Sequence, residues 1–490
     1  MTMRKKTFPL AALAAAALLL SGCSLIPTYE RPAAPVEASF PPPPAIDGAQ
    51  PQAATGAVAS ELSYQQFFAD PRLVQLVGIA LSSNRDLRAT SLAIEQARAQ
   101  FQITRANQYP AVGLAANASR APNVINGALT NSFQVGLAVT SWEIDFFGRL
   151  QSLKEQALAT YLASEEGRRA AQTSLVAGVA NGWLALQADE ELLDLSRRTV
   201  ATREDSVRLT KLRLDNGVSS ALDFQQADSL AQSARATLAQ AQRQRALDEN
   251  SLVLLLGQPL PADIRSSLAG DRLADVPPFP ALQAGLPSDL LVRRPDIRQS
   301  EQQLIAANAN IGAARAAFFP RISLTAQAGT ASNELSGLFK SGSSAFSIAP
   351  SLVLPIFDAG RNRAGLASSE AGRDIAVAQY EKSIQTAFRE VADALAGDAT
   401  LAEQLRALQA QAQAESGRFE LSDLRYRNGV ATYLDLLDAQ RSLFGAQQAV
   451  VQTRLLQRQN QVSLYKALGG GWTDQPEMAA SAASSSPATR

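Results

Sequence analysis

Asp435 and Asp438 come closest, in residue type and spacing, to a site that could do chemistry. They lie three residues apart in the segment Tyr433–Phe444, and Arg441 follows after three more, so a helix would place all three on one face. Paired carboxylates act as general acids and bases or hold a cation, but no nucleophile motif, phosphate loop or pocket signature accompanies these two. Spacing alone favours an exposed ion pair between Asp438 and Arg441, worth about 0.2–0.5 kcal/mol.

The composition argues against an enzyme and against a nucleic-acid binder. The 490-residue chain has no histidine and one cysteine, which removes the commonest general base, most transition-metal ligand sets and any intrachain disulfide. Its 45 lysines and arginines balance 45 aspartates and glutamates, and no long basic block is present. We therefore expect no catalytic residues, no cofactor and no nucleic-acid partner.

The one cysteine, Cys23, follows an N-terminal targeting segment. A positive stretch at residues 4–6 precedes an apolar core at 8–20 that is too short to span a bilayer, so 1–22 is expected to be a cleaved signal peptide. The run Leu-Ser-Gly-Cys that ends at Cys23 resembles the bacterial lipobox, in which the cysteine becomes the acylated first residue of the mature protein. This predicts a palmitate-bearing lipoprotein, with a plain secretory signal and a chance cysteine as the alternative.

The residues on either side of the main body predict a tether and a tail. Ser24 stands where inner-membrane lipoproteins carry an aspartate, which by resemblance predicts the outer membrane. Residues 23–62 are rich in proline and alanine, with four consecutive prolines at 41–44, and are expected to form an extended lipidated tether. Residues 473–490 are rich in alanine and serine and are expected to be disordered.

The body of the chain is a tandem duplication with an offset of 212 residues. Asn-Gly is a strong turn signal, because Asn tolerates and Gly favours a positive φ, so each copy predicts a helix, a tight turn and a second helix. Ser219, Ser220 and Thr432 stand where an N-cap is needed, and a carboxylate follows in the first helical turn of each copy. The matching positions are Asn216, Gly217, Val218 and Asp223 in the first copy and Asn428, Gly429, Val430 and Asp435 in the second.

This duplication predicts two structural repeats, at 63–258 and 288–472, joined by a proline-rich connector at 259–287. Each repeat contains a stretch with apolar period two, which predicts β-hairpins at about 111–141 and about 321–356. Strands of about ten residues are long enough to cross an outer membrane when tilted, although a soluble sandwich would show the same alternation. Because lipid leaves no strand edge unpaired and the smallest barrels have about eight strands, four strands per chain predict closure with other chains; three chains would supply twelve.

A long proline-free segment follows each hairpin and leads to the Asn-Gly turns at 216–218 and 428–430. About 65 residues of helix would be on the order of 100 Å long. Val176, Val179 and Trp183 have the spacing of a helix seam, and alanine and glutamine dominate the remaining faces. That composition suits a thin helical wall with liquid on one side, and it is equally typical of a solvated coiled coil without a lumen.

The chain resembles the TolC family of outer-membrane efflux factors, in its lipoprotein branch typified by OprM. The features that carry the resemblance are the lipobox, the duplicated units, the paired Asn-Gly-Val turns, the segment Tyr433–Phe444 and the run Leu464–Trp472. The resemblance implies a mainly α fold with a smaller β part. Each chain would contribute four strands to a trimeric 12-stranded outer-membrane β-barrel and long helices to a periplasmic α-helical barrel. The implied function is the outer-membrane channel of a tripartite multidrug efflux system, with a periplasmic membrane-fusion adaptor and an inner-membrane resistance-nodulation-division pump as partners.

The resemblance also assigns residues to a gate at the periplasmic tips. Asp435 and Asp438 match aspartates that line the constriction, Leu434 matches an apolar ring beside them, and Asp223 is the counterpart of Asp435 in the first copy. Tyr426 and Arg441 match positions whose contacts hold the tips shut, while Ala431 replaces an arginine latch found in the best-known member. A cation could be held at the ring of Asp435 and Asp438. The turn residues Asn216, Gly217, Val218, Asn428, Gly429 and Val430 would meet the adaptor.

Two other functions are compatible with these patterns. A type I protein-secretion conduit uses the same fold together with an ABC transporter. A lipid-anchored periplasmic coiled-coil scaffold without a pore would also show long helical hairpins. Transport assays with a defined pump separate the first alternative from drug efflux, and channel conductance separates the second.

Overall fold

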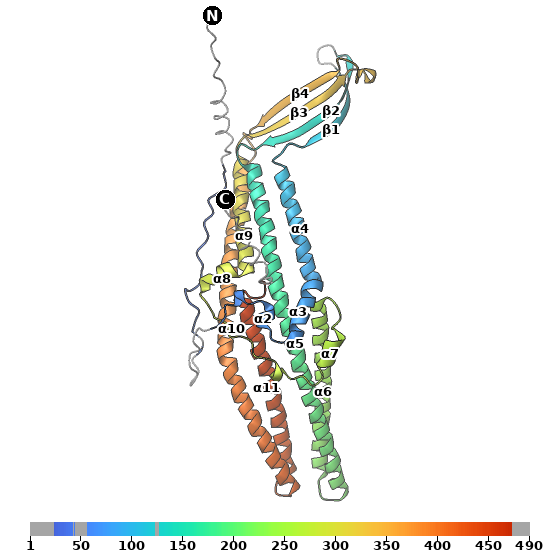
Figure 1. Cartoon of the computed structure of the whole chain (residues 1–490), viewed down its shortest axis with the longest axis vertical. Helices are drawn as coiled ribbons and strands as arrows, with labels where there is room; N and C mark the ends of the chain where they lie inside the picture. Colours follow the sequence, from blue (N-terminus) through green and yellow to red (C-terminus); the bar gives the residue numbers. More distant parts are fainter. Residues whose placement is uncertain (1–23, 43, 45–55, 123–126, 473–490) are drawn as a thin grey trace, which may run out of the picture. The chain divides into compact units, whose positions relative to one another are not determined.

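Long helices and one four-stranded antiparallel sheet make up most of the computed structural model (Figure 1). It describes residues 24–42, 44, 56–122 and 127–472; the predicted signal peptide, Cys23 and the predicted tail lie outside the described residues. The strands are β1 Val112–Pro122, β2 Leu129–Ile144, β3 Arg321–Ser332 and β4 Ser344–Val353. The α-helices are α2 Tyr64–Phe67, α3 Pro71–Ser83, α4 Arg85–Ala106, α5 Arg149–Asp215, α6 Ala221–Leu256, α7 Ala262–Ser267, α8 Pro287–Arg293, α9 Pro295–Ala316, α10 Arg361–Arg427 and α11 Tyr433–Ala467, and the short 3₁₀ helices are η1 Ala59–Glu61, η2 Leu273–Asp275 and η3 Leu335–Gly337.

The chain forms two compact units, and each takes segments from both sequence copies. The strand unit comprises the described residues of Met1–Ala33, Leu92–Glu166 and Arg298–Lys382. The hairpin unit comprises those of Ala34–Ser91, Gly167–Ile297 and Ser383–Arg490. The sheet therefore belongs to the first unit, and the two Asn-Gly turns belong to the second.

The sheet of the strand unit has the order β1-β2-β3-β4, so β1 and β4 are its edges. Its register pairs Val112 with Val139, Val139 with Ala326, and Ala326 with Ile348, which places the period-two apolar residues of all four strands on one face. That face is exposed: Leu114 retains 77% and Phe346 81% of their accessible surface. The opposite face carries small and polar side chains, among them Asn117, Gln134, Gln327 and Ser347.

A β-bulge interrupts the pairing of β2 with β3. The register shifts between Val139 and Trp142, and Ser141 adopts a φ of 51°. Past the bulge β2 continues to Ile144, so the strand is longer than the alternation of the sequence indicated. The extra residue bends the strand and increases its twist, which is the usual effect of a bulge at one end of a sheet.

The N-terminal segment of the strand unit is extended, as its composition predicts, but it packs against α9 instead of hanging free. Arg31 makes a bidentate ion pair with Glu301 at 2.7 and 2.9 Å, and the Tyr29 hydroxyl donates to the same carboxylate at 3.0 Å. A Cβ on Gly312 would lie 2.6 Å from Ile26, so only glycine lets the segment approach the helix so closely. Several specific contacts thus hold residues that follow the predicted lipidation site.

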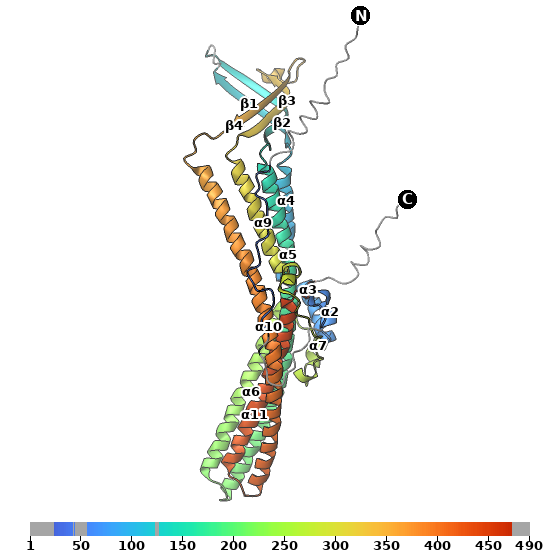
Figure 2. The ribbon, with the colours of Figure 1, turned by 90° about the vertical axis from the view of Figure 1, so that its left-hand side faces the viewer.

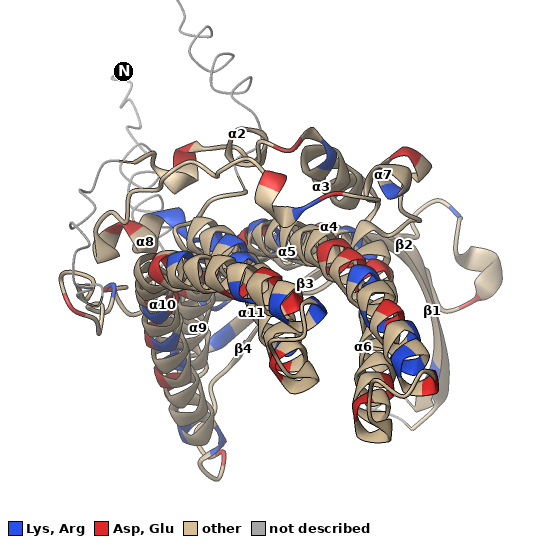
Figure 3. Ribbon diagram, turned by 90° about the horizontal axis from the view of Figure 1, so that it is seen from below, with Lys and Arg blue, Asp and Glu red and all other residues tan. Residues whose placement is uncertain are grey.

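In the hairpin unit, α5 and α6 form one helical hairpin and α10 and α11 form another (Figures 1 and 2). An aromatic core of this unit lies around Phe67. The Phe67 ring stacks on Tyr465 with centroids 4.0 Å apart, and the Phe279 ring packs on Phe67 with centroids 5.2 Å apart. The connector at 259–287 contains α7 and η2 rather than being wholly irregular. Seen from the turns, positively and negatively charged residues are interspersed along the four helices (Figure 3).

No helix in the described part of the chain is both long enough and apolar enough to cross a bilayer.

Candidate functional site

The two Asn-Gly turns end α5 and α10 with the same backbone hydrogen bonds. The Val218 amide donates to the Arg213 carbonyl at 2.8 Å and the Gly217 amide to the Leu214 carbonyl at 2.9 Å. In the second copy, Val430 and Gly429 make the equivalent bonds, both at 3.0 Å. This is the Schellman motif, which needs a left-handed residue, and the two glycines have φ of +74° and +73°.

The next helices begin at Ser220 and Thr432, and Asp223 and Asp435 complete their capping boxes. Each hydroxyl accepts a hydrogen bond from the backbone amide three residues on, while the aspartate accepts the amide of the capping residue. The backbone amide of Ser220 is the main reason that the pKa of Asp223 lies below its usual range, and the Thr432 hydroxyl is the main cause of the lowered pKa of Asp435. Two of the predicted gate carboxylates therefore also fix the geometry of the turns.

Asp438 pairs with Arg418 of α10 and not with Arg441, the partner that sequence spacing favoured. The Arg418 Nη2 atom contacts the Asp438 carboxylate, and Nη1 lies 3.2 Å from Glu415. Both side chains of the Arg418–Asp438 pair are about half exposed. The pair crosses from α10 to α11, so it joins the two helices of the second hairpin on their solvent side.

Tyr426 connects both hairpins. Its ring lies 5.3 Å from that of Tyr433 on α11, and the Arg213 guanidinium of α5 sits 4.9 Å from its centroid. Both tyrosines are buried in a tip cluster in which α6, α10 and α11 meet. The tip cluster consists of Ala227, Tyr426, Tyr433, Leu436 and Leu437, with Val207, Leu230 and Phe419 packed against it.

An exposed apolar stripe runs past each turn at matching positions of the two copies. Its members keep between 45% and 67% of their accessible surface. They are Leu209, Leu212, Val218 and Leu222 in the first hairpin and Leu421, Leu424, Val430 and Leu434 in the second. Sequence reasoning selected only Val218, Val430 and Leu434; the constant offset of 212 residues was the signal that could have found the others.

Within the described residues, no group of three or more Asp, Glu, Cys or His side chains is arranged to hold a metal ion. Asp223, Asp435 and Asp438 do not converge on one point of the chain. A cation at the predicted aspartate ring would need carboxylates from several chains.

The open sheet and the two long helical hairpins together define a class of protein. A four-stranded sheet with an exposed apolar face and two open edges is typical of a chain that completes a membrane channel with its neighbours, and long helical hairpins extend such channels. Comparison with known proteins points to the same class of protein. The family model described as "Outer membrane efflux protein" matches residues 76–258 and 286–470.

Individual relatives cover nearly the whole chain. It is 47% identical over 477 residues to the antibiotic efflux pump outer membrane protein ArpC of Pseudomonas putida, covering 96% of this chain and 97% of that one. The toluene efflux pump outer membrane protein TtgC of Pseudomonas putida shows the same identity and coverage. The open-state crystal structure of the Neisseria gonorrhoeae MtrE outer membrane channel superposes with a TM-score of 0.80 at 40% identity, covering 92% of this chain and 99% of that chain.

The chain belongs to the outer membrane efflux protein family. The predicted resemblance, fold class, outer-membrane location and efflux function are thereby confirmed. Its family is one of channel proteins.

Proposed function

We propose that three copies of this chain form the outer-membrane duct of a tripartite drug-efflux system. The observation that carries this proposal is the sheet: β1 and β4 are open edges, and its apolar face has exposed side chains on β1, β2 and β4, among them Leu114, Leu137 and Phe346. Unpaired backbone groups in hydrocarbon cost several kcal/mol each, roughly, so the edges must pair with other chains. Three chains give the twelve strands expected for the family, and acylation of Cys23 would anchor each chain in the same membrane.

The two hairpin turns are the proposed docking surface for a periplasmic membrane-fusion adaptor. They make the same pair of backbone hydrogen bonds, and each is flanked by one of the exposed apolar stripes. Asn216, Gly217 and Val218 in one turn and Asn428, Gly429 and Val430 in the other would contact the adaptor, which connects the duct to an inner-membrane resistance-nodulation-division pump. Names of the relatives point to antibiotics and toluene as the kinds of cargo.

The proposed gate lies where the second hairpins of three chains meet. Asp435, Asp438 and Leu434 would line the constriction, with Tyr426, Arg441 and Asp223 behind them. Three unpaired aspartates near one axis would repel by about 1 kcal/mol per pair at 4 Å in water, and by more when desolvated. Arg418 offsets this repulsion from within each chain, and a cation bound at the ring would offset it further.

Complementation tests the proposal. The chain is expressed with an adaptor and pump in a strain that lacks its own outer-membrane efflux channel, and drug susceptibility and single-channel conductance are measured. We expect resistance to return, and we expect purified protein to conduct ions in planar bilayers. A protein that restores secretion of a large polypeptide but never drug resistance would instead support the type I conduit, and a protein without conductance would support a scaffold.

A further inference from the structure

Arg203 of α5 is a buried cation without a carboxylate partner. Only 5% of its surface is exposed, and it makes no salt bridge within the described residues. Among the residues that the structure describes, its one hydrogen bond runs from Nη1 to the Leu230 carbonyl at 3.5 Å, and its Nε has no acceptor. Burial, and then the charge of nearby Arg441, lowers the pKa of the Arg203 guanidinium. A buried charge in this position is costly unless something neutralises it.

Another buried arginine in the same unit shows how the fold ordinarily treats such a group. Arg294 is 4% exposed, and its guanidinium binds Asp296 at 2.6 Å and Glu390 at 2.7 Å, with a further bond to the Ala467 carbonyl. All of these acceptors are supplied by the chain. Arg203 has no such set, although the matching residue of the second copy, Glu415, is a carboxylate that pairs with Arg418.

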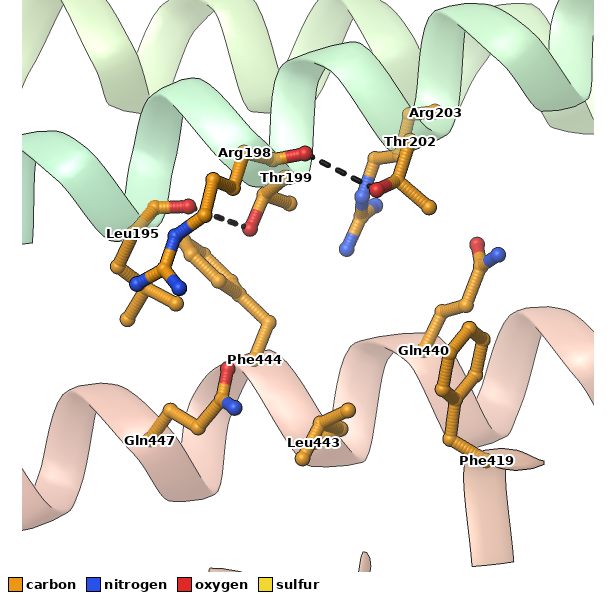
Figure 4. Close-up of a pocket in the computed structure, with 10 residues that line it drawn as sticks. All are labelled: Leu195, Arg198, Thr199, Thr202, Arg203, Phe419, Gln440, Leu443, Phe444 and Gln447. Carbon is orange, nitrogen blue, oxygen red and sulfur yellow. Dashed lines mark hydrogen bonds between the residues drawn. The ribbon is translucent and has the colours of Figure 1, made fainter. Parts of the chain in front are cut away.

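A cavity of about 180 Å³ lies beside Arg203, between α5 and α11. Figure 4 shows the Arg203 guanidinium and the Gln440 carboxamide pointing into the space between the two helices. The Gln440 Oε1 atom is buried and has no hydrogen-bond donor, so its amide group is not fixed by a partner on that side. The donors that could meet an anion are therefore the guanidinium and this amide.

Most of the remaining walls are apolar or already satisfied, and Gln447 and the exposed Arg198 complete the lining. Leu195, Leu443 and Phe444 supply hydrocarbon and aromatic surface, and the Arg203 guanidinium lies 5.9 Å from the Phe444 ring centroid. Thr199 and Thr202 also line the cavity, but their hydroxyl protons are donated to carbonyls of their own helix at 2.9 and 3.0 Å. A ligand here would meet the buried Arg203 guanidinium at one end and an apolar wall beside it.

We propose that this cavity binds a small amphipathic carboxylate, with its head on Arg203 and Gln440 and its apolar body against Phe444 and the leucines. An apolar cavity of about 150 Å³ accepts benzene, so about 180 Å³ is enough for an aryl or short alkyl carboxylate. Guanidinium and carboxylate form paired, charge-assisted hydrogen bonds, which fixes the orientation of such a ligand. If the two hairpins of a chain separate when the proposed gate opens, the bound ligand would favour the closed arrangement because it contacts α5 and α11 together.

Binding to the full-length protein in detergent is the test, with benzoate as the probe and its uncharged analogue benzamide as the ligand control. The key variant is Arg203→Met, which keeps an unbranched apolar stem and removes the charge. Arg208→Met is the matched control, because Arg208 lies on the same helix outside the cavity, is exposed and is paired with Asp205 at 2.6 Å. Calorimetry gives Kd, and thermal unfolding shows that each variant is folded.

We expect the wild type and Arg208→Met to bind benzoate with similar Kd. Arg203→Met should bind benzoate at least tenfold more weakly than the wild type does, and the wild type should bind benzamide at least tenfold more weakly than benzoate. Arg203→Met should also unfold at a higher temperature than the wild type without ligand, because it removes a buried unpaired charge. Gln440→Leu, which leaves Arg203 in place, should weaken benzoate binding several-fold. Undetectable benzoate binding to the wild type at 10 mM, undiminished binding to Arg203→Met, or equal binding of phosphate would each overturn the assignment.

Discussion

The contact between Arg213 and Tyr426 is expected to hold the two hairpins of each chain together, and its removal should open the duct. The guanidinium lies 4.9 Å from the centroid of a ring that is only 8% exposed. Cation–π contacts contribute about 0.5–1 kcal/mol at exposed sites and about 2 kcal/mol when desolvated. We therefore expect Arg213→Met to destabilise the closed state relative to the open state by about 1 kcal/mol per chain.

The effect multiplies if three chains open as one. About 3 kcal/mol per trimer corresponds to an increase of roughly 150-fold in the ratio of open to closed channels. Single-channel recording in planar bilayers measures that ratio directly. Tyr426→Leu should have at least as large an effect, because it also removes the packing of Tyr426 on Tyr433, whose ring centroid is 5.3 Å away.

Lys211→Met provides the matched control. Lys211 makes a cation–π contact of 5.8 Å with Phe224, but both residues belong to the first hairpin, so this contact does not join the two hairpins. Its loss should leave the open fraction near that of the wild type. An open fraction in Arg213→Met no higher than in Lys211→Met would refute the reasoning that this contact restrains the gate.

Three further predictions follow from the same geometry. Arg418→Met should raise conductance more than Asp438→Asn does, because it leaves three uncompensated carboxylates at the constriction; equal conductance of the two variants would argue against an aspartate ring. Gly429→Pro should abolish cross-linking to the adaptor and drug resistance, since proline cannot adopt the φ of +73° found there, and unchanged resistance would exclude this turn as a docking site. Burial, and then hydrogen bonding with Asp248, raises the pKa of Asp189 to about 8, so its contribution to stability is complete below about pH 4 and is lost as pH rises toward 8. Asp189→Asn should accordingly raise Tm at pH 8 and change it little at pH 4, and the opposite pattern in thermal unfolding would contradict the raised pKa.

Much of the secondary structure could be predicted from short-range sequence patterns. Asn-Gly followed by a hydroxyl residue and an aspartate encodes a helix stop and a capping box within a few residues, so the turns could be predicted from their own sequence. Period-two alternation similarly predicted the strands, because side chains of successive strand residues point to opposite faces. The β-bulge at Ser141 has no comparable local signal, and the alternation therefore ended too early.

Contacts between distant segments could not be predicted in this way. Asp438 has an arginine at each of two accessible positions, and only the pairing of α10 with α11 selects Arg418 over Arg441. The contact of Arg213 with Tyr426 joins different sequence copies, so no spacing rule reports it. The same is true of Arg31 and Glu301, where a proline-rich composition indicated an extended chain but not the helix it would pack on.

The most direct test of the central claim is the number of chains that close the sheet in the outer membrane. Single-particle imaging of the full-length protein extracted from outer membranes would reveal it, together with any lumen. We predict three copies that pair β4 of one chain with β1 of the next into a twelve-stranded ring around a continuous channel. A single chain whose apolar sheet face is covered by its own helices, with no lumen, would contradict it.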